Sequence, residues 1–134
     1  MRSPKQLVGE IEVAWAAGFF DGEGWTGITQ PHDRDVVTLQ MHVSQTDENV
    51  LERFRAAVGG IGKIESMRLR EGYKQVWRWR VHGQDVVDVG AKLYDYLCQP
   101  KQDQLITAIG KRLAYEELAS AKVRGRGGQL RLVS

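Results

Sequence analysis

The chain has 134 residues, a formal net charge of +2, and a composition that is 42% hydrophobic and 27% charged. This length predicts a single domain over residues 1–134, since a second core would need more chain. No apolar run approaches the ~20 residues of a membrane span, the single cysteine cannot form an intrachain disulfide, and the three histidines lack the spacing of a zinc site. We therefore expect a cytoplasmic protein without a membrane partner, in which any metal is held by oxygen ligands.

The first predicted helix covers residues 8–22 and contains two glycines near its end. Gly18 and Gly22 each cost a helix interior about 1 kcal/mol relative to Ala, so a compensating contact is expected. Together with Ala14 they recur every four residues and form a stripe poor in side chains. This stripe predicts a close contact with another helix.

Two acids, Asp21 and Glu23, lie at the C-terminus of this helix, where the helix dipole is already negative. Carboxylates are oxygen ligands for divalent cations, and a bound cation would offset that repulsion. The helix tip is therefore a candidate metal site. The alternative interpretation is a plain helix stop with Gly24 as the C-terminal cap.

Strand patterns follow the helix. Residues 25–30 predict a short strand, on which parity does not decide whether Thr26 or Thr29 faces outward. Residues 37–44 alternate apolar and polar side chains, which predicts a strand with one buried and one open face. The polar set on the open face includes Thr38, Gln40 and His42.

A helix is predicted to begin after the N-cap residue Asp47 and to end at Gly59. Residues 61–69 and 74–82 then predict a hairpin. Basic residues are unevenly distributed along the chain. Residues 1–60 carry five basic and nine acidic side chains, whereas residues 61–134, which include the hairpin, carry fourteen basic and eight acidic side chains. We expect this hairpin to present a local positive surface.

The parity of the fourth strand places Trp77 and Trp79 on the core face and Arg78 and Arg80 on the open face. The third strand mixes apolar and polar residues in both parities, so a bulge or strand end is expected to break its alternation. We include its Arg68 and Arg70 in the open face.

Two further helices are predicted over residues 85–97 and 102–121, and residues 122–134 are expected to be a flexible basic tail. The elements follow in the order αββαββαα. The sequence therefore predicts an α+β fold with two strand pairs separated by helices.

Residues 16–24 resemble the nine-residue signature of the LAGLIDADG homing endonucleases. Ala17, Gly18, Asp21 and Gly24 match it, and Glu23 keeps its last carboxylate with one more methylene. The resemblance extends to the element order and implies a four-stranded, antiparallel, saddle-shaped sheet with helices on one face. Because this chain has one signature, it also implies a homodimer through paired signature helices. The expected interface residues are Ala14, Ala17, Gly18, Asp21 and Gly22.

The resemblance implies that Glu23 is the catalytic acid that binds the metal and that the Gly22 carbonyl completes its ligand set. It also implies that Gln45 positions a water and that Lys101 lies near the scissile phosphate, while Asp21 serves helix packing or supporting hydrogen bonds. The expected cofactor is Mg²⁺. We expect Mn²⁺ to substitute for it and Ca²⁺ to bind without supporting cleavage.

The family often has a further cation one helical turn after the glutamine. This chain has Asn49 there, and Arg53 lies one turn further on. For DNA recognition, a nine-residue strand spans about 30 Å, and a β-ribbon fits the major groove. The expected DNA-binding residues are Thr29, Thr38, Gln40, His42, Arg68, Arg70, Arg78 and Arg80.

These patterns predict a homodimeric, Mg²⁺-dependent, sequence-specific endonuclease that cuts both strands of a long pseudo-palindromic DNA target, in a bacterial, phage or organellar setting. One alternative is a protein of the same fold that does not cut, either an RNA maturase or a DNA-binding regulator. Another is a dimerising α/β domain without a nucleic-acid role. Steep salt dependence of binding would separate that last class from the others.

Overall fold

The computed structural model describes residues 1–30, 36–67 and 71–126. The element order confirms the predicted αββαββαα arrangement and the α+β class. Along the chain the elements are α1 (Pro4–Glu23), β1 (Gly24–Thr29), β2 (Thr38–Gln45), α2 (Glu48–Ala57), β3 (Lys63–Ser66), β4 (Trp77–His82), α3 (Gln84–Leu93), the 3-10 helix η1 (Tyr94–Tyr96) and α4 (Gln99–Arg126).

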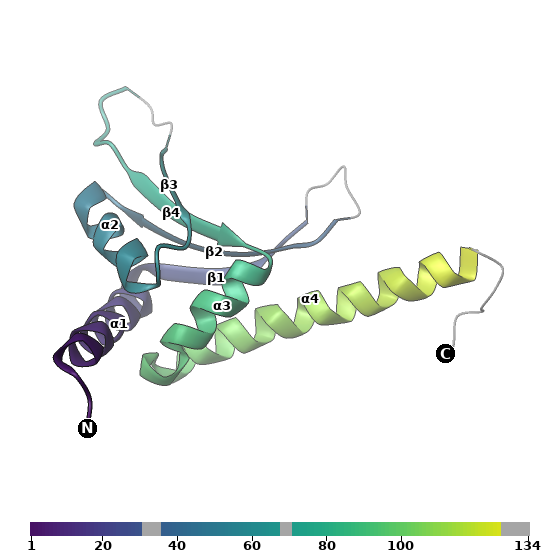
Figure 1. Ribbon diagram of the computed structural model, residues 1–134. Helices are drawn as coiled ribbons and strands as arrows, with labels where there is room; N and C mark the ends of the chain where they lie inside the picture. The colour runs from purple at the N-terminus through teal and green to yellow at the C-terminus, as the bar shows by residue number, and fades with distance from the viewer. Residues whose placement is uncertain (31–35, 68–70, 127–134) are drawn as a thin grey trace.

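The strands form one antiparallel sheet in the order β1-β2-β4-β3. Figure 1 shows the helices gathered on one side of this sheet, where α2 and α3 contact β2 and β4, and α4 contacts β1. The opposite side carries no helix in Figure 1. The sheet therefore has a core face beneath the helices and an open face.

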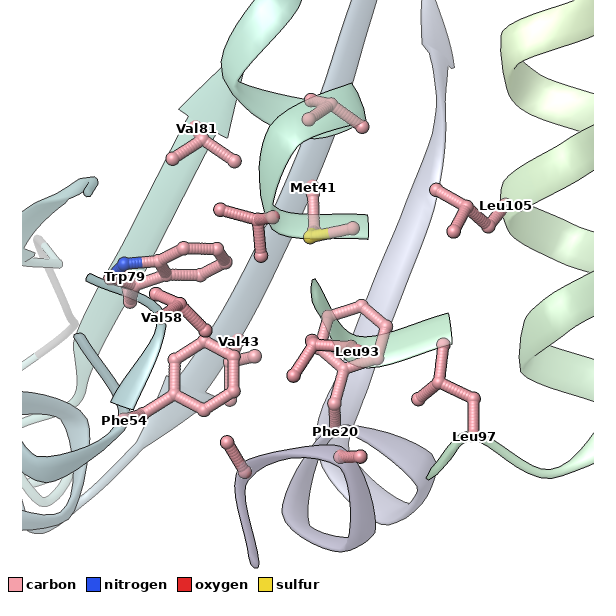
Figure 2. Packing of buried hydrophobic residues seen from close by; sticks show 14 of the residues in the cluster. Phe20, Met41, Val43, Phe54, Val58, Trp79, Val81, Leu93, Leu97 and Leu105 are labelled. Atoms are coloured by element: carbon pink, nitrogen blue, oxygen red, sulfur yellow. The ribbon is translucent and has the colours of Figure 1, made fainter. Parts of the chain in front are cut away.

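The core lies between the helices and the sheet and is built around aromatic side chains (Figure 2). Phe54 packs edge-on against Trp79, with ring centroids 4.7 Å apart, and stacks on Phe20 at 6.3 Å. The indole nitrogen of the fully buried Trp79 donates to the Ile61 carbonyl at 2.9 Å. This bond satisfies the polar atom that burial of a tryptophan would otherwise leave without a partner.

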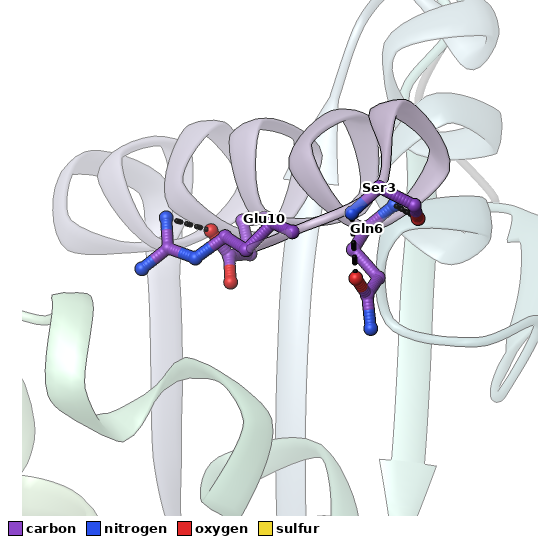
Figure 3. Close-up of polar contacts among 4 residues, drawn as sticks. Ser3, Gln6 and Glu10 are labelled. Carbon is purple, nitrogen blue, oxygen red and sulfur yellow. Dashed lines mark hydrogen bonds and ion pairs between the residues drawn. The ribbon is translucent and has the colours of Figure 1, made fainter.

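α1 begins at Pro4, four residues before the predicted start, because Ser3 and Gln6 form a capping box. The Ser3 hydroxyl accepts from the Gln6 amide at 3.2 Å, and the Gln6 side chain accepts from the Ser3 amide at 2.8 Å (Figure 3). Arg2 and Glu10 form an ion pair of 2.7 Å along the same first turns. The helix also continues one residue past the predicted end, to Glu23.

Gly24 ends α1, but its backbone is extended, with φ −88° and ψ 160°, and it is the first residue of β1. Gly24 is the C-cap residue that the sequence indicated, and its N–H donates to the Phe20 carbonyl, but it caps the helix in an extended conformation. A Cβ at this position would lie 2.3 Å from the ring of Phe20. Glycine is needed here because the buried phenyl ring packs against the backbone where the helix turns into the strand.

The hairpin strands are shorter than predicted, since β3 covers 63–66 and β4 covers 77–82. Gly60 and Gly62 have φ values of 79° and 111°, which excludes residues 60–62 from an extended strand. Pairing continues one step beyond β3, where the Met67 amide donates to the Val76 carbonyl. The predicted DNA-binding residues Arg68 and Arg70 lie outside the described residues.

α4 is longer than predicted at both ends. Pro100 is tolerated because it lies in the first turn, where backbone N–H groups have no partner within the helix. At the other end, residues 122–126 are helical where a tail was expected, and residues 127–134 lie outside the described residues. The second half of α4 projects away from the rest of the protein (Figure 1).

The helix predicted over 85–97 ends at Leu93 and is followed by the separate turn η1. In the described ranges, no helix is both long enough and apolar enough to cross a membrane.

Candidate nucleic-acid interface and metal site

One side of α1 carries small residues that face solvent. Ala14, Gly18 and Gly22 are exposed, and a Cβ built on either glycine would have no atom outside its own helix turn within 4 Å. Leu7 and Ile11 continue the same stripe towards the N-terminus, with 48% and 55% of their surface exposed. Within one protomer, the small-residue stripe therefore lies free of the sheet and of the other helices.

The tip of α1 lies at the corner of the sheet where β1 begins. Lys101, in the first turn of α4, donates from Nζ to the Gly24 carbonyl at 2.5 Å. Glu23 is the preceding residue and its side chain is exposed. This contact places the Lys101 ammonium beside the backbone of the residue that follows Glu23. The two contacting residues, Lys101 and Gly24, are 77 residues apart in the chain.

Gln45 ends β2 at this same corner. β2 runs antiparallel to β1, and Gln45 lies two residues beyond Val43, which pairs with Gly24. The Gln45 side-chain oxygen accepts from the Thr46 amide at 2.8 Å. The NH₂ group is therefore the part of this amide that can reach a substrate or a water.

The donor set at this corner fits a hard divalent cation that shares its coordination with a substrate. No cluster of three or more His, Cys, Asp or Glu side chains that could enclose a metal occurs in the part of the chain that the structure describes. Mg²⁺ is typically bound through one or two carboxylates together with substrate phosphates and waters. Glu23 supplies one carboxylate, and the exposed Gly22 lies beside it at the helix end.

Asp21 has a contact within its own protomer. Both of its carboxylate oxygens accept from the backbone N–H of Cys98, at 3.0 and 3.2 Å. The Cys98 carbonyl in turn accepts from the amides of Lys101 and Gln102, in the first turn of α4. Asp21 therefore anchors the start of the helix that carries Lys101. A separate side-chain hydrogen bond between the Cys98 thiol and Asp21, followed by the charge of the carboxylate, raises the pKa of the thiol.

The register of the sheet arranges the open face in transverse rows, because directly paired residues share a face. The row nearest the corner contains a carboxylate and the rows beyond it contain aromatic, cationic and hydroxyl side chains. In order from the corner, the rows are Ser44, Arg78 and Glu65; Trp25, His42, Arg80 and Lys63; Gly27, Gln40 and His82; and Thr29 with Thr38.

This register answers the parity question of β1, because Thr29 shares the open face with Thr38 while Thr26 is buried. On β3 the open face carries Lys63 and Glu65, whereas Ile64 pairs with Trp79 on the core face.

The cations on this face are not all free of acidic partners. Glu65 lies 3.0 Å from the guanidinium of Arg80 and 3.8 Å from the ammonium of Lys63. Arg78 contacts the Ser44 hydroxyl at 3.5 Å. The positive surface expected from the sequence is therefore partly neutralised at its centre, and Arg80 is held by its acidic neighbour.

No family model matches the chain. A stretch of 70 residues, 52% of the chain, is 39% identical to a protein from Debaryomyces hansenii named "Probable intron-encoded endonuclease aI2", and the match spans 9% of that protein's length.

The solved structures that resemble the chain are DNA complexes of homing endonucleases. I-CvuI bound to its target in the presence of Ca superposes with a TM-score of 0.63 at 22% identity, over 87% of this chain and 73% of that one. I-CvuI with an I-CreI target in the presence of Mg, in which the DNA is not cleaved, gives 0.61 at 24% identity over 85% and 71%. The LAGLIDADG meganuclease I-AabMI bound to uncleaved DNA gives 0.57 at 22% identity over 81% and 38%.

The chain has the LAGLIDADG homing endonuclease fold.

Within this LAGLIDADG fold, one of the expected interface residues is not available to a partner. Ala17 is fully buried and belongs to the protomer's own core. Asp21 is half-buried and accepts from the Cys98 amide, which is a supporting hydrogen bond of the kind expected for it. Sequence spacing alone did not separate Ala17 from the exposed stripe, because the α1 face that packs on the protomer's core became visible only with the fold.

Arg53 does not supply the missing cation near the LAGLIDADG helix tip. Its guanidinium makes two hydrogen bonds of 2.9 Å to Glu12 and lies 3.8 Å from the ring centroid of Trp15. Both partners are on α1, well before the tip. The sequence-based possibility that Arg53 compensates for Asn49 is therefore not supported.

Trp25 is an open-face residue that the sequence pattern did not reveal. Its parity follows from the pairing of β1 with β2, where Trp25 lies opposite His42. The signal was present in the sequence, because Trp25, Gly27 and Thr29 share one parity. A partner strand was needed to decide which parity is open.

His42 predicts a pH-dependent term in stability. Burial, followed by the charges of Arg78 and Arg80, lowers the pKa of its imidazole below the ordinary value of 6.5. As pH falls through about 6.5 the unfolded chain takes up a proton before the folded protein does, so the free energy of unfolding falls until the pH passes the lowered pKa. Above about pH 6.5 neither state binds this proton, and the term is constant.

Urea unfolding of wild type and His42→Gln between about pH 7.5 and 5 measures this term. Below about pH 6.5, the free energy of unfolding of wild type should fall relative to that of His42→Gln, and above this pH the difference between the two proteins should stay constant. A difference that stays constant over the whole range would contradict the lowered pKa.

The Asp21 anchor predicts a local effect on α4. Asp21→Ala removes the acceptor of the Cys98 amide, so the free energy of unfolding should fall by about 0.5–1.5 kcal/mol, since water can reach this exposed hydrogen bond. Hydrogen exchange should quicken at the amides of Cys98, Lys101 and Gln102. Glu117→Gln, on the exposed distal part of α4, is the control. Unchanged exchange at these amides would show that Asp21 does not hold the helix.

Proposed function

We propose that this chain is a sequence-specific DNA endonuclease that acts as a homodimer and hydrolyses phosphodiester bonds with Mg²⁺. This proposal rests mainly on the position of Glu23, an exposed carboxylate at the end of the small-residue stripe of α1 and at the corner of the open face. The names of the similar proteins, which are endonucleases and DNA complexes, support this proposal.

In the proposed dimer, the stripes of two α1 helices pack against each other. Exposed glycines allow their backbones to approach closely, and the exposed Leu7 and Ile11 add apolar area at the other end of the contact. Each protomer contributes the same surface to this contact, as in a two-fold symmetric (isologous) interface. The two Glu23 carboxylates then lie near each other, one for each DNA strand.

Glu23 would hold the divalent ion, together with a carbonyl at the helix end. The ion would neutralise charge on the phosphate and activate a water. Lys101 would place a second positive charge beside the phosphate, in an orientation held by the Gly24 carbonyl. Gln45 would donate from its NH₂ group to orient the attacking water.

The open face would read the target in the major groove. Its proposed contacts are Thr29, Thr38, Gln40, His42, Arg78 and Arg80, which the register places on one surface. Hydroxyl, amide and guanidinium groups are the ones that form hydrogen bonds with base edges and phosphates.

Selection of cleaved sequences from a randomised duplex library in Mg²⁺ tests the function. The proposal predicts a two-fold symmetric consensus whose cleavage requires the metal. Specific retention of DNA with no cleavage of any retained sequence would instead identify a binding protein with the same fold. Binding without sequence preference and without salt dependence would contradict a nucleic-acid role altogether.

A further inference from the structure

The indole of Trp25 lies flat on the open face of β1. A Cβ placed on Gly27 would be 2.2 Å from Cζ2 and 2.6 Å from Cη2 of this ring, so the ring covers the backbone where Gly27 has no side chain. The same indole stacks on the imidazole of His42, with centroids 4.9 Å apart and planes inclined by 28°. Trp25 and His42 thus form an aromatic platform, built over Gly27 and half-buried.

The platform is surrounded by hydrogen-bonding and charged side chains. Arg80 lies beside His42 in the same row, and Gln40 lies beside Gly27 in the next. The lowered pKa of His42 keeps the imidazole uncharged at neutral pH. The faces of the two rings therefore form an apolar contact surface, inside a sheet face whose other groups suit phosphates and polar base edges.

The chemistry of the major groove restricts what such a surface can contact. Base edges in this groove present hydrogen-bond donors and acceptors, and the apolar group among them is the C5-methyl of thymine. A phosphate placed over the ring faces would lose hydration without gaining a donor, since the N–H groups of an indole and an imidazole lie in the ring plane. A donor or acceptor on a base edge would likewise lose its hydrogen bond to water without gaining a partner on the ring face.

We propose that Trp25 and His42 form a contact site for the C5-methyl group of thymine, and that Gly27 makes this site possible. The inference rests on the proposed DNA binding and adds a specificity-determining residue to it. A target half-site should accordingly contain a thymine whose selection depends on Trp25. 5-Methylcytosine carries the same methyl group and should be accepted at that position better than cytosine.

Wild type and Trp25→Ala are each used to select binding sequences from a randomised duplex library. The contacted base pair is the position at which wild type prefers thymine and Trp25→Ala does not. Replacing that thymine by uracil removes only the methyl group. For wild type the replacement should weaken binding about fourfold for each half-site, the effect expected from burying one methyl-sized group. For Trp25→Ala, thymine and uracil should bind equally.

Gly27→Ala is an independent variant that retains the tryptophan. Its Cβ would displace the indole, so it should also lose the preference for thymine over uracil. Gly110→Ala, at an exposed glycine of α4 where a built Cβ has nothing within 4 Å, is the matched control and should keep that preference. Circular dichroism of each variant verifies that it is folded.

The inference is overturned if wild type and Trp25→Ala select the same bases and discriminate thymine from uracil equally. It is also overturned if uracil replaces thymine in wild type without loss, since the indole would then be stacking on a base rather than contacting its methyl group. In both cases DNA is still selected, so the proposed function stands. A wild-type protein that selects no DNA would overturn the proposed function together with this inference.

Discussion

Glu23→Gln abolishes DNA cleavage and leaves target binding in place. The amide keeps the size of the side chain but loses the negative charge that holds a divalent cation, so the cleavage rate should fall at least about 1,000-fold. The exposed position of Glu23 means that the fold should tolerate the change. Single-turnover cleavage of the selected target in Mg²⁺ measures the loss, and titration in Ca²⁺ measures the binding.

Glu117→Gln is the matched control for this experiment, because it removes one exposed carboxylate from α4, away from the corner. It should cleave at the wild-type rate. If Glu23→Gln cleaves as fast as Glu117→Gln, then Glu23 does not hold the catalytic metal.

Gly18→Leu should separate dimerisation from folding. Within the protomer a Cβ at this position has nothing within 4 Å outside its own helix turn, and replacing a helix glycine with a good helix former gains about 1 kcal/mol, so the monomer should be at least as stable. In the dimer the new side chain prevents close approach of the helices. Overpacking costs about 1–3 kcal/mol for each copy, which raises the dimer Kd by at least about 30-fold when both protomers carry the change.

Gly110→Leu provides the comparison, since Gly110 is also an exposed helix glycine with nothing within 4 Å of a built Cβ. It lies on α4, outside the proposed interface. Sedimentation equilibrium should show a weakened dimer only for Gly18→Leu, and cleavage should fall with it. Equal dimer affinity for the two variants would show that the stripe of α1 is not the interface.

Local patterns in the sequence predicted most of the fold. Alternation fixed which sides of β2 and β4 are buried, because Met41 and Trp79 differ so clearly in polarity from His42 and Arg80. Where neighbouring residues were similar in polarity, the pattern failed. β1 offered Thr26 and Thr29 in opposite parities, and only pairing with β2 decided between them.

Contacts between distant segments explain the other differences. Asp21 reaches Cys98 and Lys101 reaches Gly24, each across 77 residues, and no spacing rule predicts such a pair. The resemblance placed Lys101 near the helix tip, yet it gave no partner for it. The sequence likewise indicated Gly24 as the end of the helix, but it did not show that the ring of Phe20 leaves no room for a Cβ there.

A mixed dimer shows whether two protomers each contribute one Glu23 to a shared DNA target. Wild-type and Glu23→Gln protomers carrying different affinity tags can be purified together through both tags and incubated with a supercoiled plasmid that contains the selected target and Mg²⁺. This mixed dimer should make no double-strand breaks and should at most nick one strand. Double-strand cleavage by the mixed dimer at the wild-type rate would contradict it.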